Sequence, residues 1–120
     1  MKIYVSHSKN FDYKKELYEV LENSGLNQEF ILPHKESNSS FNSKELFKNK
    51  QCDLVLAEVS LPATGQGIEL GWADAYQVPL VCVYKKDAKI AGSLKVITDQ
   101  FIEYENTSDL ISKLKNYFNK

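Results

Sequence analysis

A glutamate near the middle of the chain, Glu69, has the surroundings of a carboxylate that performs chemistry. It stands in the run AEVSLPATGQGIELGWADAY, where an apolar stretch is followed by a loop containing Pro62 and then by a helical pattern. We expect that helix to begin after about residue 66, with Glu69 in its first turn. Free backbone N–H groups and the helix dipole favour an ionised carboxylate there, and the same groups can hold an anionic ligand. Glu69 is therefore either a nucleophile beside a small-molecule site or a glutamate that only complements the dipole.

The histidines and cysteines do not form the pattern of a metal or redox site. His7 and His34 have no acidic or cysteine partners at a useful spacing, so the sequence predicts no metal. His7 follows the first apolar run, where a histidine either contacts a ligand or supports a loop. Cys52 and Cys82 lack CxxC spacing and lie beside or within apolar runs, which favours buried thiols over a disulfide or zinc site. We expect no cofactor.

Strand-like and helix-like segments alternate along the whole chain, and these elements must position the chemical groups. Apolar runs predict strands at residues 2–6, 30–32, 53–57, 78–84 and 101–104. Helices are expected after Ser8 or Asn10, after Ser43, from Ile68, and after Thr107 or Ser108. In the helix that carries Glu69, Ile68, Trp72 and Ala75 form the helical repeat, and Gly71 permits a close approach to the sheet. Residues 35–43 are rich in Ser and Asn and predict a loop.

This alternation predicts a parallel sheet with right-handed crossovers and helices on both faces. We expect a single-domain, flavodoxin-like or Rossmann-like three-layer sandwich with five parallel strands in the order 2-1-3-4-5. Ligands bind such sheets outside the carboxyl ends of the strands, where the order reverses between the first and third strands. That rule brings the turn Ser6-His7-Ser8 beside Glu58 and the loop of residues 60–69. Topology therefore predicts the same site as the local pattern around Glu69.

Composition limits the kinds of partner. The 120 residues suit one domain, and 42% hydrophobic with 26% charged residues is typical of a globular protein. Fifteen basic and 16 acidic residues leave a net charge of −1, which disfavours nucleic acid or an anionic membrane surface as a partner. No run approaches the ~20 apolar residues that span a bilayer, and the amino terminus lacks a signal-like apolar region. We expect a cytoplasmic protein.

The motif around Glu69 resembles that of a known enzyme family. The run from Asp53 through AEVS, the Pro/Gly loop and GIELGWA is similar to the nucleoside 2-deoxyribosyltransferase family, especially its small branch, the 2′-deoxynucleoside 5′-monophosphate N-glycosidases. The similarity covers residues 53–84, and elsewhere the agreement is architectural. The resemblance implies one such domain over residues 1–120. It also implies cleavage or transfer at the N-glycosidic bond of 2′-deoxynucleosides or their 5′-monophosphates, with the choice between the two left open.

Individual residues match the family's motif. Glu69 matches the nucleophile, which forms a covalent deoxyribosyl-enzyme intermediate. Gly65 and Gly67 match glycines that bring backbone N–H groups to the ligand, and Tyr4 matches an aromatic residue near the sugar and base. Ser93 matches a serine that contacts the phosphate from a neighbouring subunit, so the resemblance implies a homodimer.

Three departures from the family's motif affect substrate recognition. The family's second carboxylate, an aspartate eight residues before the position of Asp53, is Glu45 here. Its phosphate-contacting serine in the Pro/Gly loop is Ala63, with Thr64 beside it as a possible substitute. Its first loop normally contains glycine before a serine, whereas this chain reads Ser6-His7-Ser8-Lys9.

The expected chemistry needs two groups. Breaking an N-glycosidic bond builds positive charge on the sugar, which an anionic Glu69 can stabilise and trap, while a second group protonates the departing base. Two carboxyl groups in a retaining arrangement lie about 5 to 5.5 Å apart. Glu58 and Glu45 compete for the second role, and Glu58 alternatively anchors loops. His7 and Ser8 are candidates for contact with the phosphate or base.

Two other classes of protein share this layout. A non-catalytic nucleotide-binding or signalling module would keep the fold and the Gly loop without the acid, and the altered first loop and Ala63 favour that alternative. A phosphoacceptor receiver domain is excluded, because the first strand ends in Ser6-His7-Ser8 rather than in an acidic pair.

Overall fold

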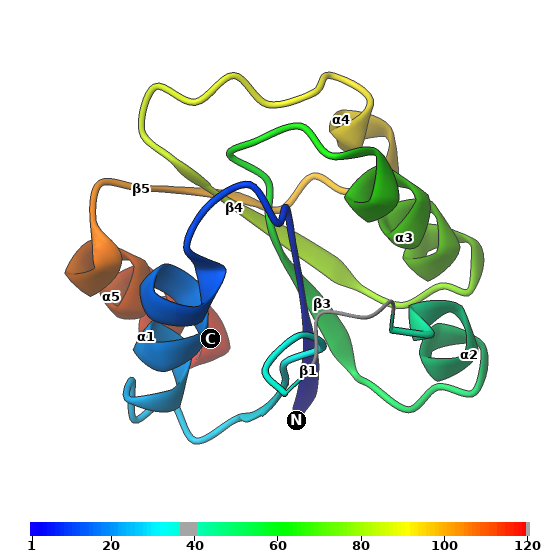
Figure 1. Ribbon diagram of the computed structural model, residues 1–120, viewed down its shortest axis with the longest axis horizontal. Helices are drawn as coiled ribbons and strands as arrows, with labels where there is room; N and C mark the ends of the chain where they lie inside the picture. The colour runs from blue at the N-terminus through cyan, green and yellow to red at the C-terminus, as the bar shows by residue number, and fades with distance from the viewer. Residues whose placement is uncertain (37–40, 120) are drawn as a thin grey trace.

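A five-stranded, all-parallel sheet forms the middle layer of the computed structural model, which describes residues 1–36 and 41–119 (Figure 1). The strands are β1 Lys2–His7, β2 Glu29–Ile31, β3 Leu54–Glu58, β4 Leu80–Lys85 and β5 Phe101–Tyr104. Their order is β2-β1-β3-β4-β5, which confirms the predicted α/β fold and strand order. Part of the loop predicted at residues 35–43 lies outside the described residues.

The central strands are buried on both faces, as expected for a parallel sheet with helices on either side. All five residues of β3 are buried. Strand β1 lies between β2 and β3, with Ile3 aligned to Phe30 on one side and to Leu54 on the other. The order therefore reverses at β1 and β3, and the carboxyl ends of these strands form a crevice.

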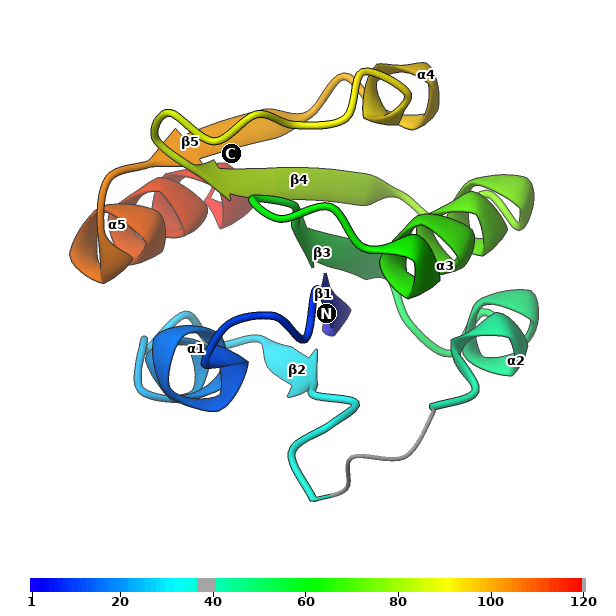
Figure 2. The ribbon, with the colours of Figure 1, turned by 45° about the horizontal axis from the view of Figure 1, so that its top comes forward.

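Helices cover the two faces in separate groups (Figures 1 and 2). One group is a π-helical segment η1 Lys14–Tyr18, its continuation α1 Glu19–Glu22, and α5 Thr107–Phe118. The other is α2 Ser43–Lys48, α3 Thr64–Ala75 and α4 Leu94–Ile97. Each group has its own apolar core. Val5 and Leu56 pack with Leu110 under the first group, and Tyr4 and Val55 pack with Leu70 under the second.

Helix α3 begins earlier than the sequence predicts. Its N-cap is Ala63, and the N–H of Gly67 already donates to the Ala63 carbonyl at 3.0 Å. Gly65 and Gly67 are therefore helical rather than part of the loop. Each glycine costs a helix about 1 kcal/mol relative to alanine, but tertiary packing of a helix face outweighs such local costs. Glu69 is consequently the sixth residue of α3 and lies in its second turn, not its first.

The buried face of α3 also differs from the predicted one. Ile68 is 52% exposed and Ala75 is exposed, while Trp72 is half-buried. A side chain built at Gly71 would meet nothing within 4 Å, so no close approach to the sheet depends on that glycine. The residues that face the sheet are Gln66, Leu70 and Ala73.

Asparagine and aspartate provide the helix caps that the sequence assigned to serine and threonine. Asn42 Oδ1 accepts a hydrogen bond from the Glu45 N–H at 3.2 Å at the start of α2. Asn106 caps α5 in the same way, accepting from the Asp109 N–H at 2.8 Å. The Asp12 side chain, rather than Ser8 or Asn10, accepts from a backbone N–H at the start of the first helix, that of Lys15 at 3.4 Å. Asparagine is as good an N-cap as serine, so the Ser43 hydroxyl is free for another contact.

The thiols and the lengths of the helices complete the description of the fold. Cys52 and Cys82 are buried and free, as predicted, and burial raises the pKa of Cys82 to about 12. In residues 1–36 and 41–119 no helix is both long enough and apolar enough to cross a membrane. The cellular location stays a prediction.

Candidate active site

A cavity of about 490 Å³ opens beside the carboxyl end of β1, at the predicted reversal of strand order. Its walls come from β1 and the loop after it, from the segment after β2, from the first residue of α2, and from α3 as far as Trp72. They include Tyr4, Ser8, Ser43, Thr64, Glu69 and Trp72. A volume of this size suits a small molecule.

Glu69 is held in this cavity through one of its two carboxylate oxygens. The Tyr4 hydroxyl donates to Glu69 Oε2 at 2.8 Å, and the Ser43 hydroxyl donates to the same atom at 2.7 Å. Glu69 Oε1 accepts no hydrogen bond from any described residue. Burial and the adjacent negative charge of Glu69 raise the pKa of Tyr4, so its hydroxyl keeps its proton and remains a donor.

Rigid elements position these three groups. Tyr4 lies in the central strand β1, is only 1% exposed, and packs edge-on against Phe47 of α2 with ring centroids 5.3 Å apart. Ser43 is the first residue of α2, and Glu69 projects from the second turn of α3. Two helices and a strand thus meet at one carboxylate. The sequence predicted that the helix dipole would favour an ionised Glu69 in the first turn. In the structure, the Tyr4 and Ser43 hydroxyls instead donate hydrogen bonds to this carboxylate.

The amino end of α3 supplies a possible anion site in the same cavity. Ala63, Thr64, Gly65 and Gln66 all line it. The first helical hydrogen bond is donated by the Gly67 N–H, so the N–H groups of residues 64–66 have no backbone partner in the part of the chain that the structure describes. Such groups bind phosphate or carboxylate at helix termini.

His7 is a buried, neutral imidazole that joins three segments around the cavity. Its Nδ1 lies 2.7 Å from the Ser8 carbonyl, and its Nε2 lies 2.6 Å from the Tyr18 hydroxyl. Because a carbonyl only accepts, Nδ1 carries the proton and Nε2 accepts from Tyr18. The Tyr18 oxygen in turn accepts from the His34 N–H at 3.2 Å. Burial lowers the pKa of His7 to about 4, and both ring nitrogens are engaged within the protein, so its contact with a ligand stays a prediction.

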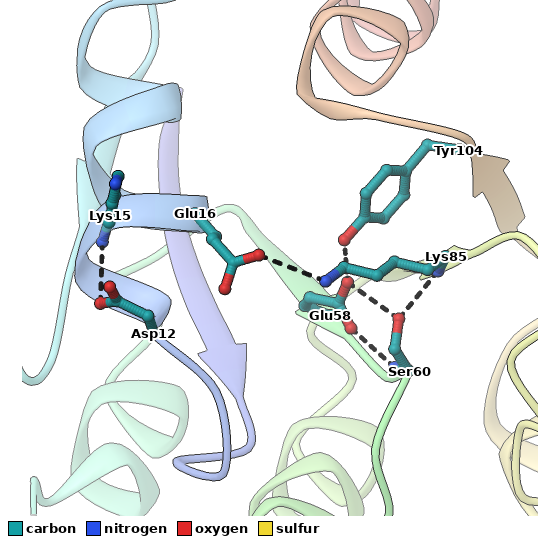
Figure 3. Close-up of polar contacts among 7 residues, drawn as sticks. All are labelled: Asp12, Lys15, Glu16, Glu58, Ser60, Lys85 and Tyr104. Atoms are coloured by element: carbon teal, nitrogen blue, oxygen red, sulfur yellow. Dashed lines mark hydrogen bonds and ion pairs between the residues drawn. The ribbon is translucent and has the colours of Figure 1, made fainter.

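Glu58 belongs to a separate polar cluster at the carboxyl ends of β3, β4 and β5 (Figure 3). Its carboxylate is 2% exposed and accepts from the Ser60 N–H at 2.6 Å, from the Ser60 hydroxyl at 3.0 Å, and from the Tyr104 hydroxyl. Ser60 Oγ also accepts from the Lys85 N–H at 2.8 Å. Glu58 lines a different cavity, of about 340 Å³, with Phe11. These contacts support the alternative in which Glu58 anchors loops.

Glu45 and Ser93 also lie outside the walls of the Glu69 cavity. Glu45 is exposed in the first turn of α2. Ser93 is exposed at the start of α4 and lines a neighbouring cavity of about 370 Å³, together with Gly67 and Thr64. Thr64 lines both cavities, so the two are separated only by the beginning of α3. The roles of Glu45 and Ser93 stay predictions.

Sequence reasoning missed two residues of this region, Ser43 and Tyr18. Ser43 was expected to cap α2, because a helix cap and a long-range donor look identical in the local sequence. Tyr18 reads as one more apolar position of the first helix, although its hydroxyl connects His7 to the segment after β2. Among the described residues, no group of three or more His, Cys, Asp or Glu side chains is placed to hold a metal ion.

The fold and the site together define a Rossmann-like α/β protein with a carboxylate held in a cavity at the reversal of strand order. Comparison with known proteins shows which members of this class the chain resembles. No family model matches the chain. A protein of Syntrophotalea carbinolica named "Putative 2'-deoxynucleoside 5'-phosphate N-hydrolase 1" is 32% identical in an alignment 73 residues long, which covers 56% of this chain and 49% of that protein. The match thus spans about half the length of this curated relative.

A solved structure agrees over nearly the whole fold. The structure of a CMP N-glycosidase from Clostridium botulinum superposes with a TM-score of 0.66 at 20% identity, covering 95% of this chain and 98% of that one. At this identity the likeness concerns the fold. The name of the curated relative agrees with the resemblance of this chain to the 2′-deoxynucleoside 5′-monophosphate N-glycosidases of the nucleoside 2-deoxyribosyltransferase family, and the solved structure confirms the fold.

Proposed function

We propose that this protein cleaves the N-glycosidic bond of 2′-deoxynucleosides or their 5′-monophosphates, with Glu69 as the nucleophile. The observation that carries the proposal is the geometry of Glu69: a carboxylate in a cavity, with Oε2 bound by two hydroxyl donors and Oε1 without a partner among the described residues. The name of the Syntrophotalea relative supports the substrate class.

The reaction takes place in two steps. In the first, a lone pair of Glu69 Oε1 forms a bond to C1′ of the sugar while the C1′–N bond breaks, and the departing base takes that electron pair together with a proton from an acidic side chain or from solvent. In the second, the oxygen of a water molecule forms a bond to C1′ and gives up a proton to a base or to solvent, while the C1′–Oε1 pair returns to the carboxylate. A second nucleobase in place of water would make the enzyme a transferase.

The 5′-phosphate is expected at the amino end of α3. The N–H groups of residues 64–66 provide donors and the positive end of the helix dipole. Ala63 has no hydroxyl to add, so the Thr64 side chain and Lys9, which both line the cavity, are the expected additional contacts.

A second candidate function is a non-catalytic nucleotide-binding module. The observation that favours it is that Glu69 is the only carboxylate among the described residues that line the cavity, since Glu45 and Glu58 lie elsewhere. A glycosidase would then need Glu45 to turn toward the cavity, or another donor such as a lysine or a histidine, to protonate the base.

Incubation with a panel of deoxynucleosides and their monophosphates, with detection of free base, separates the two functions. We expect base release by the wild type, and release at the background rate by Glu69→Gln, because an amide cannot form the glycosyl ester. Glu103→Gln, a change at an exposed glutamate of β5, should retain full activity. A 2′-fluoro substrate should leave its sugar on Glu69.

Two results would contradict the proposal. Binding of nucleotides without release of base by the wild type would identify a binding module. A sugar mapped by peptide mass spectrometry to Glu45 or Glu58 would assign the nucleophile to another carboxylate.

A further inference from the structure

The hydroxyl of Ser43 makes a contact that the folding of its own helix does not require. Ser43 is the first residue of α2 and is 1% exposed. The cap of that helix is provided by Asn42, so Ser43 has no capping role. Its hydroxyl instead crosses to α3 and donates to Glu69 Oε2 at 2.7 Å, over a separation of 26 residues.

The second donor on Oε2 has a consequence for the other oxygen. A carboxylate oxygen offers two in-plane lone-pair positions. Oε2 accepts two hydrogen bonds, from the Tyr4 and Ser43 hydroxyls, and two bonds match that capacity. Oε1 accepts none from the described residues and is the oxygen available for attack on a sugar.

We propose that Ser43 is a positioning residue of the glycosidase reaction. With Tyr4 it fixes Oε2 so that Oε1 attacks the sugar, and it stabilises the carboxylate as a leaving group when the covalent intermediate is hydrolysed. This inference rests on the proposed function, because it assigns a role in each of the two proposed steps.

The two steps place opposite demands on the hydrogen bond from Ser43. When Oε1 bonds to C1′, the negative charge of Glu69 disappears and Oε2 becomes the carbonyl oxygen of an ester, which is a weaker acceptor than a carboxylate. When water attacks C1′, its proton passes to solvent or to a base, the C1′–Oε1 pair returns to Glu69, and the charge reappears. The Ser43 hydroxyl therefore accelerates the second step and slightly restrains the first.

The packing around Ser43 keeps this donor in place. Phe47, one turn further along α2, is 0% exposed and packs against the Tyr4 ring. Lys44 Nζ lies 6.0 Å from the ring centroid of Trp72 on α3, within the range of a cation–π contact. Within one turn after Ser43, helix α2 thus contacts both of the elements that carry Tyr4 and Glu69.

The test compares Ser43→Ala with the wild type on a substrate that the wild type cleaves. We expect a burst of free base close to one equivalent per enzyme, followed by turnover slowed about 10- to 100-fold, the scale of one lost hydrogen bond to a charged group. Intact mass spectrometry of quenched samples should show the sugar on most of the Ser43→Ala protein and on little of the wild type.

Two further variants separate the hydroxyl from the stability of α2. Asn42→Ala removes the helix cap but leaves Ser43 and should show no burst. Ser43→Cys keeps the size of the side chain with a weaker donor, and it should accumulate the intermediate to a lesser extent. If Ser43→Ala does not fold, Ser43→Cys alone tests the role of the hydroxyl.

Several outcomes would overturn the inference. Slower turnover of Ser43→Ala without accumulated sugar, or an equal burst in Asn42→Ala, would assign Ser43 to structure alone. The wild type could release base and carry the sugar on Glu69 while Ser43→Ala turns over at the same rate as the wild type. That result would refute this inference and leave the proposed function standing. A wild type that releases no base from any substrate would refute both.

Discussion

Two glutamates near the same edge of the sheet, Glu58 and Glu69, differ in what surrounds their carboxylates. Glu58 is 2% exposed, and both of its oxygens accept hydrogen bonds, from Ser60 and Tyr104. Glu69 is half-buried and has one oxygen without a described partner. A buried carboxylate that accepts hydrogen bonds on both oxygens is held within the protein, whereas one with a free oxygen in a cavity can react. The surroundings therefore favour a structural role for Glu58 and a chemical one for Glu69.

At the residue scale, Tyr104→Phe tests the structural role of Glu58. The change removes one donor from a buried carboxylate, so we expect the free energy of unfolding to fall by about 1 to 3 kcal/mol. Urea unfolding monitored by circular dichroism measures this value. Tyr76→Phe is the matched control, because the Tyr76 hydroxyl makes no hydrogen bond with the described residues and its loss should cost little. Equal losses in the two variants would show that the Tyr104 hydroxyl does not support Glu58.

At the scale of elements, the cavity depends on three segments that meet at His7. The hydrogen bonds of its ring join the loop after β1 to Tyr18 of η1, and Tyr18 to His34 after β2. The ring also stacks on Tyr13, with centroids 4.3 Å apart. This chain of contacts requires a neutral imidazole that accepts at Nε2. Protonation of His7 removes that acceptor, so the arrangement of the cavity wall depends on pH.

His7 is expected to make stability depend on pH below neutrality. Burial, with smaller contributions from the nearby His34 and Lys9, lowers its pKa to about 4, whereas in the unfolded chain it has the ordinary value of 6.5. Between these values the unfolded chain binds a proton that the folded chain does not, so stability falls as the pH falls from 6.5 to 4. The full loss below pH 4 is about 3 kcal/mol, from a difference of about 2.5 pKa units at about 1.4 kcal/mol per unit.

The measurement is urea unfolding of the wild type and of His7→Gln at several pH values between 7 and about 4. The variant should lose less stability than the wild type over this range, because glutamine does not titrate. Parallel curves for the two proteins would show that His7 does not cause the dependence on pH.

At the scale of the whole molecule, α3 and α4 each expose a large apolar side chain. Val96 is 86% exposed and Ile68 is 52% exposed, although both are large apolar residues. The cavity of about 370 Å³ between these elements contains Ser93 and Lys89 and adjoins the Glu69 cavity at Thr64. Leu61, which is 38% exposed, lines this cavity, and exposed apolar side chains that form a patch are typical of surfaces that bind another protein. We therefore keep the proposal of a homodimer in which Ser93 completes a phosphate site.

Sedimentation velocity at working concentration should show a dimer. In binding measurements, Ser93→Ala should weaken the binding of monophosphates by about 1 to 3 kcal/mol, the scale of a lost charge-assisted hydrogen bond. It should leave the binding of nucleosides almost unchanged. Ser108→Ala, at an exposed serine of α5, is the control and should alter neither. A monomer would refute the shared site, and an equal loss for nucleosides and monophosphates would show that Ser93 does not read the phosphate.

The sequence alone predicted the layers, the strand order and the neighbourhood of the site. Short apolar runs such as 53–57 alternate with helical segments, and the handedness of the crossovers leaves few ways to connect them. The reversal of strand order then places the cavity near the carboxyl end of β1. These features follow from local patterns and general rules, so one sequence was enough to predict them.

Only the tertiary structure decided where α3 begins and what holds Glu69. Gly65 and Gly67 are poor helix formers, and packing against the sheet outweighed that local preference. Ser43 and Tyr4 reach Glu69 over separations of 26 and 65 residues. Such contacts depend on how α2 and α3 are rotated and shifted on the sheet, which is determined by the packing of many side chains at once. The local sequence around a serine or tyrosine therefore does not indicate which distant residue its hydroxyl will bind.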